Sequence, residues 1–121
     1  MIRLGLVLLG LFHLGNGIFM LAAPEAWYAA VPGVIQTGPM NHHFIVDIGL
    51  AFMASGAGMI AGWRVDPTAA TFALAGATFP ALHALFHVWE WIVDGIPTDP
   101  HILASDAIAV MGVSFLGFAI A

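Results

Sequence analysis

Four long runs of apolar residues constrain the fold of this chain more than any other feature of its sequence. The runs cover residues 2–23, 43–63, 68–93 and 101–121. Each run has about the 20 residues that a helix needs to cross the hydrocarbon of a bilayer. The connecting stretches "APEAWYAAVPGV", "RVDP" and "DGIPTDP" are rich in turn-forming Pro, Gly and Asp. The sequence therefore predicts an all-α fold, in which residues 1–121 form a single four-helix transmembrane bundle.

The composition agrees with a lipid environment. Hydrophobic residues make up 61% of the 121 residues and charged residues only 7%, whereas about a quarter of a soluble domain is charged. The chain has no Cys, which excludes disulfides and thiolate metal sites. A net charge of −5 argues against a nucleic-acid partner. The expected partner is the lipid bilayer, and association into a homo-oligomer or a larger membrane complex stays open.

The two arginines predict how the bundle is oriented. Arg3 precedes the first span and Arg64 lies between the second and third, so four spans place both on one side. Because basic loops stay in the cytoplasm, both termini are predicted to be cytoplasmic, in a cell inner membrane. The alternative is that the first run is a signal peptide with Arg3 as its charged region. His13 and Asn16 are unusual in such a peptide, which favours a retained helix.

Ionisable side chains inside these apolar runs are the main functional signal. His83, His87 and Glu90 are spaced four and three residues apart, which places them on one helix face. His43 and Asp47 are four apart near the outer end of the second span. Intramembrane ionisable groups usually face the bundle interior or a water-filled cavity. We therefore expect a polar chamber in the outer half, open toward the periplasmic side.

The first and fourth spans carry polar groups at similar depth, whereas the inner half has almost none. His13 and Asn16 lie midway along the first span, and Asp106 lies in the outer half of the fourth. The inner part of the second span, "ASGAGMIAG", instead has Gly58 and Gly62 at the spacing for close helix packing. The loop of residues 24–41 is expected to fold over the outer mouth as a short lid.

A transition-metal site is the interpretation that the pattern favours. Imidazoles and carboxylates bind Cu, Fe and Zn, which the sequence does not distinguish. Four-helix bundles hold such ions with inward-facing Glu and His. The predicted ligands are His83, His87, Glu90, His43 and Asp47. The further cofactor-binding candidates, as extra ligands or as partners that orient the imidazoles, are His13, Asn16 and Asp106.

Redox chemistry by a metal-dependent membrane oxidoreductase, or metal handling, would follow from such a site. Several alternatives stay open. A metal-free hydrogen-bonded network would pin the helices together, as in a non-catalytic accessory subunit of a larger membrane complex. A metal-free enzyme could act on a lipophilic substrate. Haem would need axial histidines from different helices.

The stretch "NHHFIVDIGLAFMASGAG", which follows "WYAAVPGV", resembles small four-helix bacterial membrane proteins of the DoxX-like type. Such proteins often carry an aromatic–x–x–Asp–Ile–Gly stretch, matched here by Phe44, Asp47, Ile48 and Gly49. A basic residue is usual before that Asp, and Val46 stands there instead. The resemblance covers the first half of the chain. It implies four helices in a bacterial inner membrane and implies no activity.

Overall fold

The computed structural model describes residues 2–121, and within that range it is built of helices and short connections without strands. Four helical runs are long and apolar enough to cross a membrane, which indicates a multi-pass membrane protein. The predicted all-α four-helix bundle is thus confirmed. The four runs are α1 (Ile2–Ala22), α3 (His42–Ala61), α4 (Ala69–Val93) and the stretch Pro100–Ile120.

The fourth run changes from α to π geometry in its middle. It consists of α5 (Pro100–Ala104), the π-helical η2 (Ser105–Gly112) and α6 (Val113–Ile120). The Asp99 carboxylate accepts hydrogen bonds from the first free backbone N–H groups of α5 and so begins the run. π-helical turns are rare in proteins, and those that do occur are often found at functional sites. This one carries Asp106, one of the predicted site residues.

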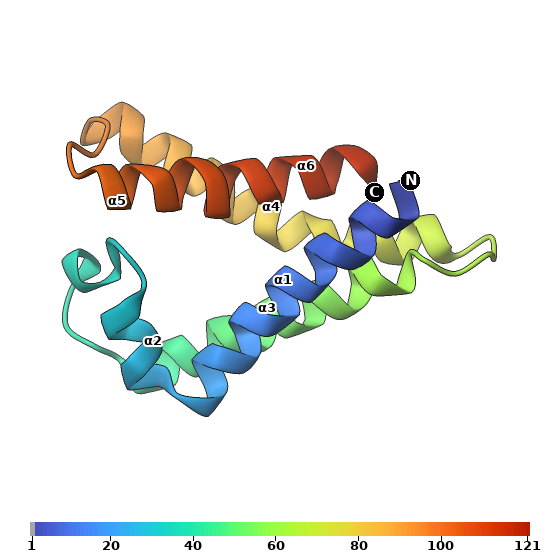
Figure 1. The fold of residues 1–121 in the computed structure, drawn as a ribbon, viewed down its shortest axis with the longest axis horizontal. Helices are drawn as coiled ribbons and strands as arrows, with labels where there is room; N and C mark the ends of the chain where they lie inside the picture. The colour runs from blue at the N-terminus through green and yellow to red at the C-terminus, as the bar shows by residue number, and fades with distance from the viewer. Residues whose placement is uncertain (1) are drawn as a thin grey trace.

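The helices lie close together at one end of the molecule and spread apart at the other (Figure 1). Both chain termini and the connection of residues 62–68 lie at the narrow end, here called the terminal end. The wide end, here called the distal end, carries α5 and the connection between α1 and α3. That connection contains α2 (Pro24–Ala30) and η1 (Val34–Thr37).

Glycines hold the central helices in close contact. A Cβ added at Gly56 of α3 would lie 2.5 Å from the carbonyl oxygen of Gly10 in α1. On the other side of α3, a Cβ added at Gly58 would lie 2.9 Å from the Cα of Gly76 in α4. Both distances are too short for any side chain, so the backbones touch as the small-residue pattern predicts.

The terminal half of the bundle is closed by apolar packing. Leu6, Met59, Ala73 and Ala77 are buried together there, with Leu9 and Ile120 packed against them. No ionisable group is part of this cluster. Within the four spans, the ionisable side chains that are buried or half-buried are His13, His83, His87, Glu90 and Asp106, none of which belongs to this cluster.

Candidate histidine–carboxylate site

One face of α4 supplies the centre of the site. The ring centroids of His83 and His87 are 4.8 Å apart, with the ring planes nearly perpendicular at 82°. His87 Nδ1 lies 3.6 Å from Glu90 Oε2. Helical spacings of four and three residues stack these side chains on successive turns. The structure thus brings together three of the residues that the sequence predicts for the site.

Asp106 reaches the same place from η2. Its Oδ1 lies 3.5 Å from His87 Nδ1, and its Oδ2 accepts a 3.2 Å hydrogen bond from the Trp91 indole N–H. The Asp106 side chain is 12% exposed. The carboxyl group therefore has an indole donor and an imidazole neighbour, as a buried polar group requires.

Trp91 is a site residue that the sequence analysis missed. Its indole is half-buried and fixes Asp106, although outer tryptophans usually suggest the aromatic belt of the membrane surface. The usable signal was its spacing, because Trp91 follows His87 by four residues and so shares its helix face.

A row of aromatic rings extends the site inward to α1. Phe52 of α3 lies edge-on to His83 with centroids 5.7 Å apart, and its other side stacks on His13 at 5.7 Å and 8°. His13 also meets Phe12 edge-on at 5.4 Å. The imidazoles of His13 and His83 thus both lie against the ring of Phe52.

His13 is a buried polar group without a polar partner. Its side chain is 1% exposed, and neither ring nitrogen has a hydrogen-bond partner among the described residues. A neutral imidazole has one N–H donor and one acceptor nitrogen. Leaving such groups unpaired away from water costs about 1–3 kcal/mol each, so His13 is retained at the expense of stability.

His43 and Asp47 lie elsewhere. His43 Nε2 is 3.2 Å from Asp47 Oδ2, and these side chains are 88% and 55% exposed. Neither makes an ion pair or ring contact with the other site candidates in residues 2–121. The buried face of α3 is instead formed by Ile45, Gly49 and Phe52. Residues two positions away from these point about 200° around the helix, and hence outward.

Asn16 has a structural contact. Its Oδ1 accepts a 2.9 Å hydrogen bond from the Trp27 indole N–H, and this bond ties α2 to α1. The Tyr28 hydroxyl donates a 2.6 Å hydrogen bond to the Gly38 carbonyl and so folds the connection back on itself. Asn16 therefore positions the cover of the site rather than contacting the histidines of α4.

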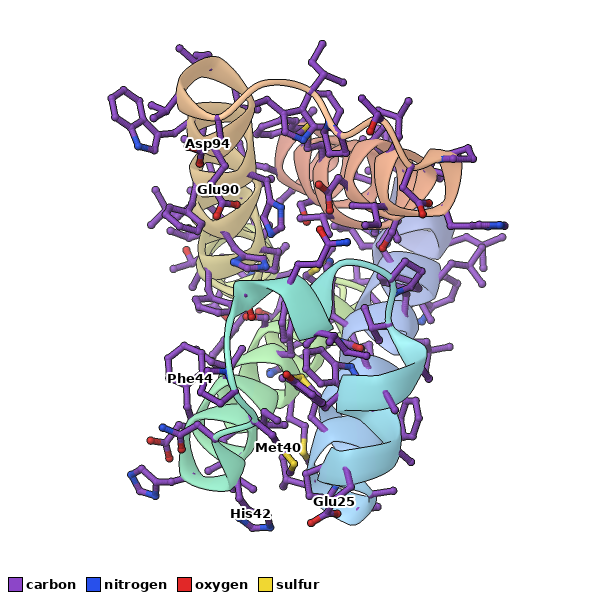
Figure 2. The ribbon with its side chains drawn as sticks, turned by 90° about the vertical axis from the view of Figure 1, so that its left-hand side faces the viewer. Glu25, Met40, His42, Phe44, Glu90 and Asp94 are labelled. Atoms are coloured by element: carbon purple, nitrogen blue, oxygen red, sulfur yellow. The ribbon has the colours of Figure 1, made fainter. Side chains whose placement is uncertain are left out.

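The connection of residues 24–41 lies across the distal end, where it was expected to form a lid (Figure 2). A Cβ added at Gly33 would lie 3.2 Å from Ile102 of α5, so the lid reaches the fourth span. In the same view Glu90 and Asp94 follow each other along α4, while His42 points away from the helices. His42 is exposed, as is usual for a histidine at a membrane surface.

The predicted metal-ligand set is not assembled. Among residues 2–121 no group of three or more His, Asp or Glu side chains is placed to hold a metal ion. The distances of 3.6 and 3.5 Å from His87 Nδ1 to the carboxylates of Glu90 and Asp106 are nevertheless close to those between two ligands of one metal ion. Two ligands of a tetrahedral ion with bonds near 2.1 Å lie about 3.4 Å apart. A haem held between His13 and His83 would have to displace the ring of Phe52, which lies against both imidazoles.

Comparison with known proteins adds no constraint on the function. No family model, curated protein or solved structure matches this chain. The function must be inferred from the chemistry of the site itself.

Proposed function

We propose that this membrane protein uses its distal His–carboxylate row to exchange protons, as an acid–base site for a small membrane-soluble ligand. The observation that carries the proposal is the position of His87, whose imidazole contacts both Glu90 and Asp106. The row continues from His87 to His83 and, beyond Phe52, to His13.

The residue types suit this chemistry. An imidazole can accept a proton on one nitrogen and donate one from the other, and a neighbouring carboxylate stabilises the charged ring. Ionisable residues at membrane depth commonly mark proton relays and polar pathways. The two unpaired nitrogens of His13 supply a donor and an acceptor for a polar group that arrives from outside the chain.

Infrared difference spectroscopy on protein in nanodiscs tests the proposal. In the difference spectrum produced by a change of pH we expect a carboxyl C=O band that disappears in Asp106→Asn. Asp94→Asn is the matched control, because Asp94 is exposed at the end of α4 and its side chain makes no ion pair with a site residue in residues 2–121. If Asp106→Asn leaves the spectrum unchanged, the proposal of proton exchange at this site is wrong.

A single transition-metal ion is the second candidate. The two distances from His87 Nδ1 favour it, with Glu90 and Asp106 as carboxylate ligands and His83 as a further imidazole. Small rotations of these side chains would be needed to bring all of the ligands to one ion. Elemental analysis of detergent-purified protein would then give a near-stoichiometric Cu, Fe or Zn that His87→Ala removes and His42→Ala retains. An optical spectrum of the same sample tests for haem.

We further propose that the site faces the periplasm from a cell inner membrane. Arg3 in the first turn of α1 and Arg64 in the connection of residues 62–68, the two Arg residues of a chain without Lys, both lie at the terminal end, which the positive-inside rule assigns to the cytoplasm. A green fluorescent protein fused to the C-terminus should fluoresce, and a dark fusion would reverse the orientation. We also propose a relationship to DoxX-like proteins, which the match at Phe44, Asp47 and Gly49 supports.

A further inference from the structure

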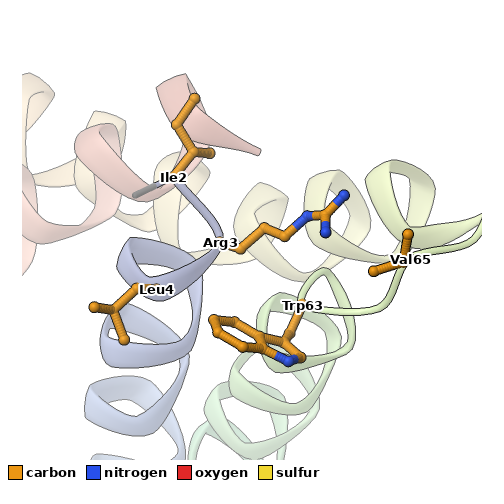
Figure 3. Close-up of a pocket in the computed structure, with 5 residues that line it drawn as sticks. All are labelled: Ile2, Arg3, Leu4, Trp63 and Val65. Atoms are coloured by element: carbon orange, nitrogen blue, oxygen red, sulfur yellow. The ribbon is translucent and has the colours of Figure 1, made fainter.

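A second candidate site lies at the terminal end, away from the histidines. An open cavity of about 830 Å³ lies between the start of α1 and the end of α3. The side chains of Arg3, on α1, and Trp63, on the connection that follows α3, line this space (Figure 3). Its remaining walls are apolar, and the lining residues are Ile2, Arg3, Leu4, Trp63 and Val65.

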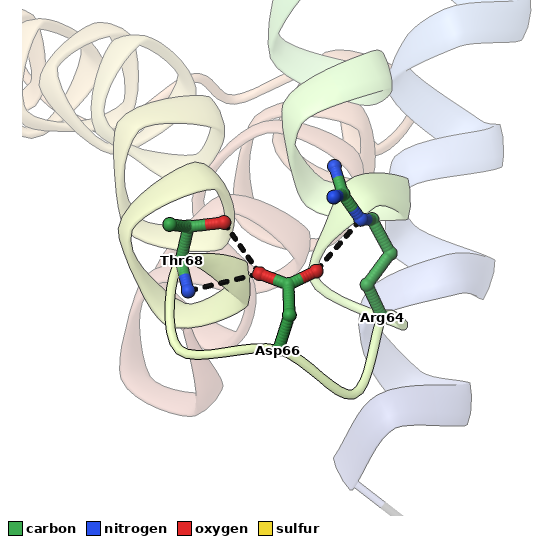
Figure 4. A network of polar contacts seen from close by, with 3 residues as sticks. All are labelled: Arg64, Asp66 and Thr68. Carbon is green, nitrogen blue, oxygen red and sulfur yellow. Dashed lines mark hydrogen bonds and ion pairs between the residues drawn. The ribbon is translucent and has the colours of Figure 1, made fainter.

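Among the side chains of residues 2–121, Arg3 supplies the unengaged positive charge at this end. Arg64 is already engaged, because its Nε lies 2.8 Å from Asp66 Oδ2 and its guanidinium lies 5.9 Å from the Phe72 ring centroid. Thr68 holds the other oxygen of Asp66 through its hydroxyl and backbone N–H, which completes a closed network (Figure 4). The Arg3 side chain makes no ion pair or hydrogen bond within residues 2–121.

The exposure of the walls indicates a lipid environment. Ile2, Leu4, Trp63 and Val65 are 63%, 53%, 53% and 83% exposed. Apolar side chains this exposed at the end of a transmembrane helix face acyl chains and headgroups. Tryptophan is enriched at that level of the membrane, where its ring meets apolar chains and its N–H meets polar headgroups.

We propose that this cavity binds the headgroup of an anionic phospholipid from the adjacent leaflet. The planar guanidinium of Arg3 can donate two parallel hydrogen bonds to phosphate oxygens. The Trp63 indole offers a further N–H donor and an apolar ring beside the glycerol and upper acyl chains. Basic cavities between transmembrane helices take up anionic headgroups in this way. The proposal does not depend on the function of the distal site.

Native mass spectrometry with equal amounts of phosphatidylglycerol and phosphatidylcholine tests the proposal. Arg3→Gln should lower the preference for bound phosphatidylglycerol about fivefold, the usual effect of one basic residue near an anionic surface. Arg64→Gln is the matched control. It removes the same charge from the same end of the bundle, but from a guanidinium that Asp66 already occupies. Its lipid preference should stay within about twofold of the wild type.

Three results would overturn the proposal. The preference for phosphatidylglycerol could survive in Arg3→Gln. It could also fall equally in both variants, which would mean that the lipid responds to the overall charge of this end and not to the cavity. Soluble glycerol phosphate could also displace the lipid at matched concentration, which would mean a site for free phosphate. Arg3 is exposed, so its replacement should not disturb folding, and circular dichroism of both variants checks this.

Discussion

Replacing His13 with leucine should make the protein more stable. The imidazole is 1% exposed, and both of its nitrogens lack a hydrogen-bond partner among the described residues. Removing two unsatisfied polar groups from a buried site is worth about 1–3 kcal/mol for each group. Leucine has a similar volume and no polar atom, so His13→Leu relieves this cost without opening a large cavity.

The ring contacts of His13 reduce that gain. The imidazole stacks on Phe52 at 5.7 Å and meets Phe12 edge-on at 5.4 Å. Aromatic pairs contribute about 0.5–1.5 kcal/mol each beyond simple burial, and leucine loses both. The net expectation, from the middle of each range, is a stabilisation of about 2 kcal/mol.

Asn16→Leu is the matched control, one turn further along α1. Asn16 accepts the Trp27 indole N–H at 2.9 Å, so leucine there leaves a donor unpaired and should destabilise the protein by about 1 kcal/mol. Reversible unfolding of both variants in mixed micelles with increasing SDS, followed by tryptophan fluorescence, measures the difference. If His13→Leu is destabilised as much as Asn16→Leu, the imidazole has a polar partner and the reasoning is refuted.

Three further predictions concern the packing and the connections. Gly56→Ala places a Cβ 2.5 Å from the α1 backbone and should cost about 1–2 kcal/mol in the same unfolding assay, whereas Gly15→Ala meets nothing within 4 Å and should stabilise slightly. Hydrogen bonds from the Thr68 hydroxyl and backbone N–H lower the pKa of the Asp66 carboxyl, whose ordinary value is 3.8. The stability that this lowered pKa contributes is fully present above pH 3.8 and is lost as the pH falls through the lowered pKa. Thr68→Val should therefore make the stability depend less on pH in strong acid. Tyr28→Phe breaks the 2.6 Å hydrogen bond that folds the lid and should speed its amide hydrogen exchange without changing global unfolding.

Much of the fold could be predicted because the bilayer limits the choices. Uninterrupted apolar runs fix the number and length of the spans, and glycines such as Gly58 mark where backbones touch. The grouping of His83, His87 and Glu90 follows from the geometry of a single helix, which sequence spacing determines.

The assignment of His43 and Asp47 could not be settled by spacing alone. Spacing shows that two residues share a face but not which neighbour that face meets. The glycines held the missing information, because Gly49 and Gly56 mark the face of α3 that packs against α1. Asp47 lies two residues from Gly49 and therefore points to the opposite side of the helix.

Two other features depend on contacts between helices. The π geometry of η2, which carries Asp106, has no signature in the local sequence. The position of Phe52 against both His13 and His83 depends on how α1, α3 and α4 pack. Neither feature follows from the periodicity of one segment.

Cross-linking of introduced cysteines with a short thiol reagent tests most directly whether the polar side chains of α4 and η2 meet in one interior site. The chain has no cysteine, so introduced pairs react against a clean background. His87→Cys combined with Asp106→Cys should be joined in the membrane by a short bifunctional thiol reagent, since the native side chains meet at their tips, 3.5 Å apart. His43→Cys with Asp106→Cys should stay unlinked. Efficient cross-linking of the second pair, or none of the first, would contradict the arrangement on which the proposed function rests.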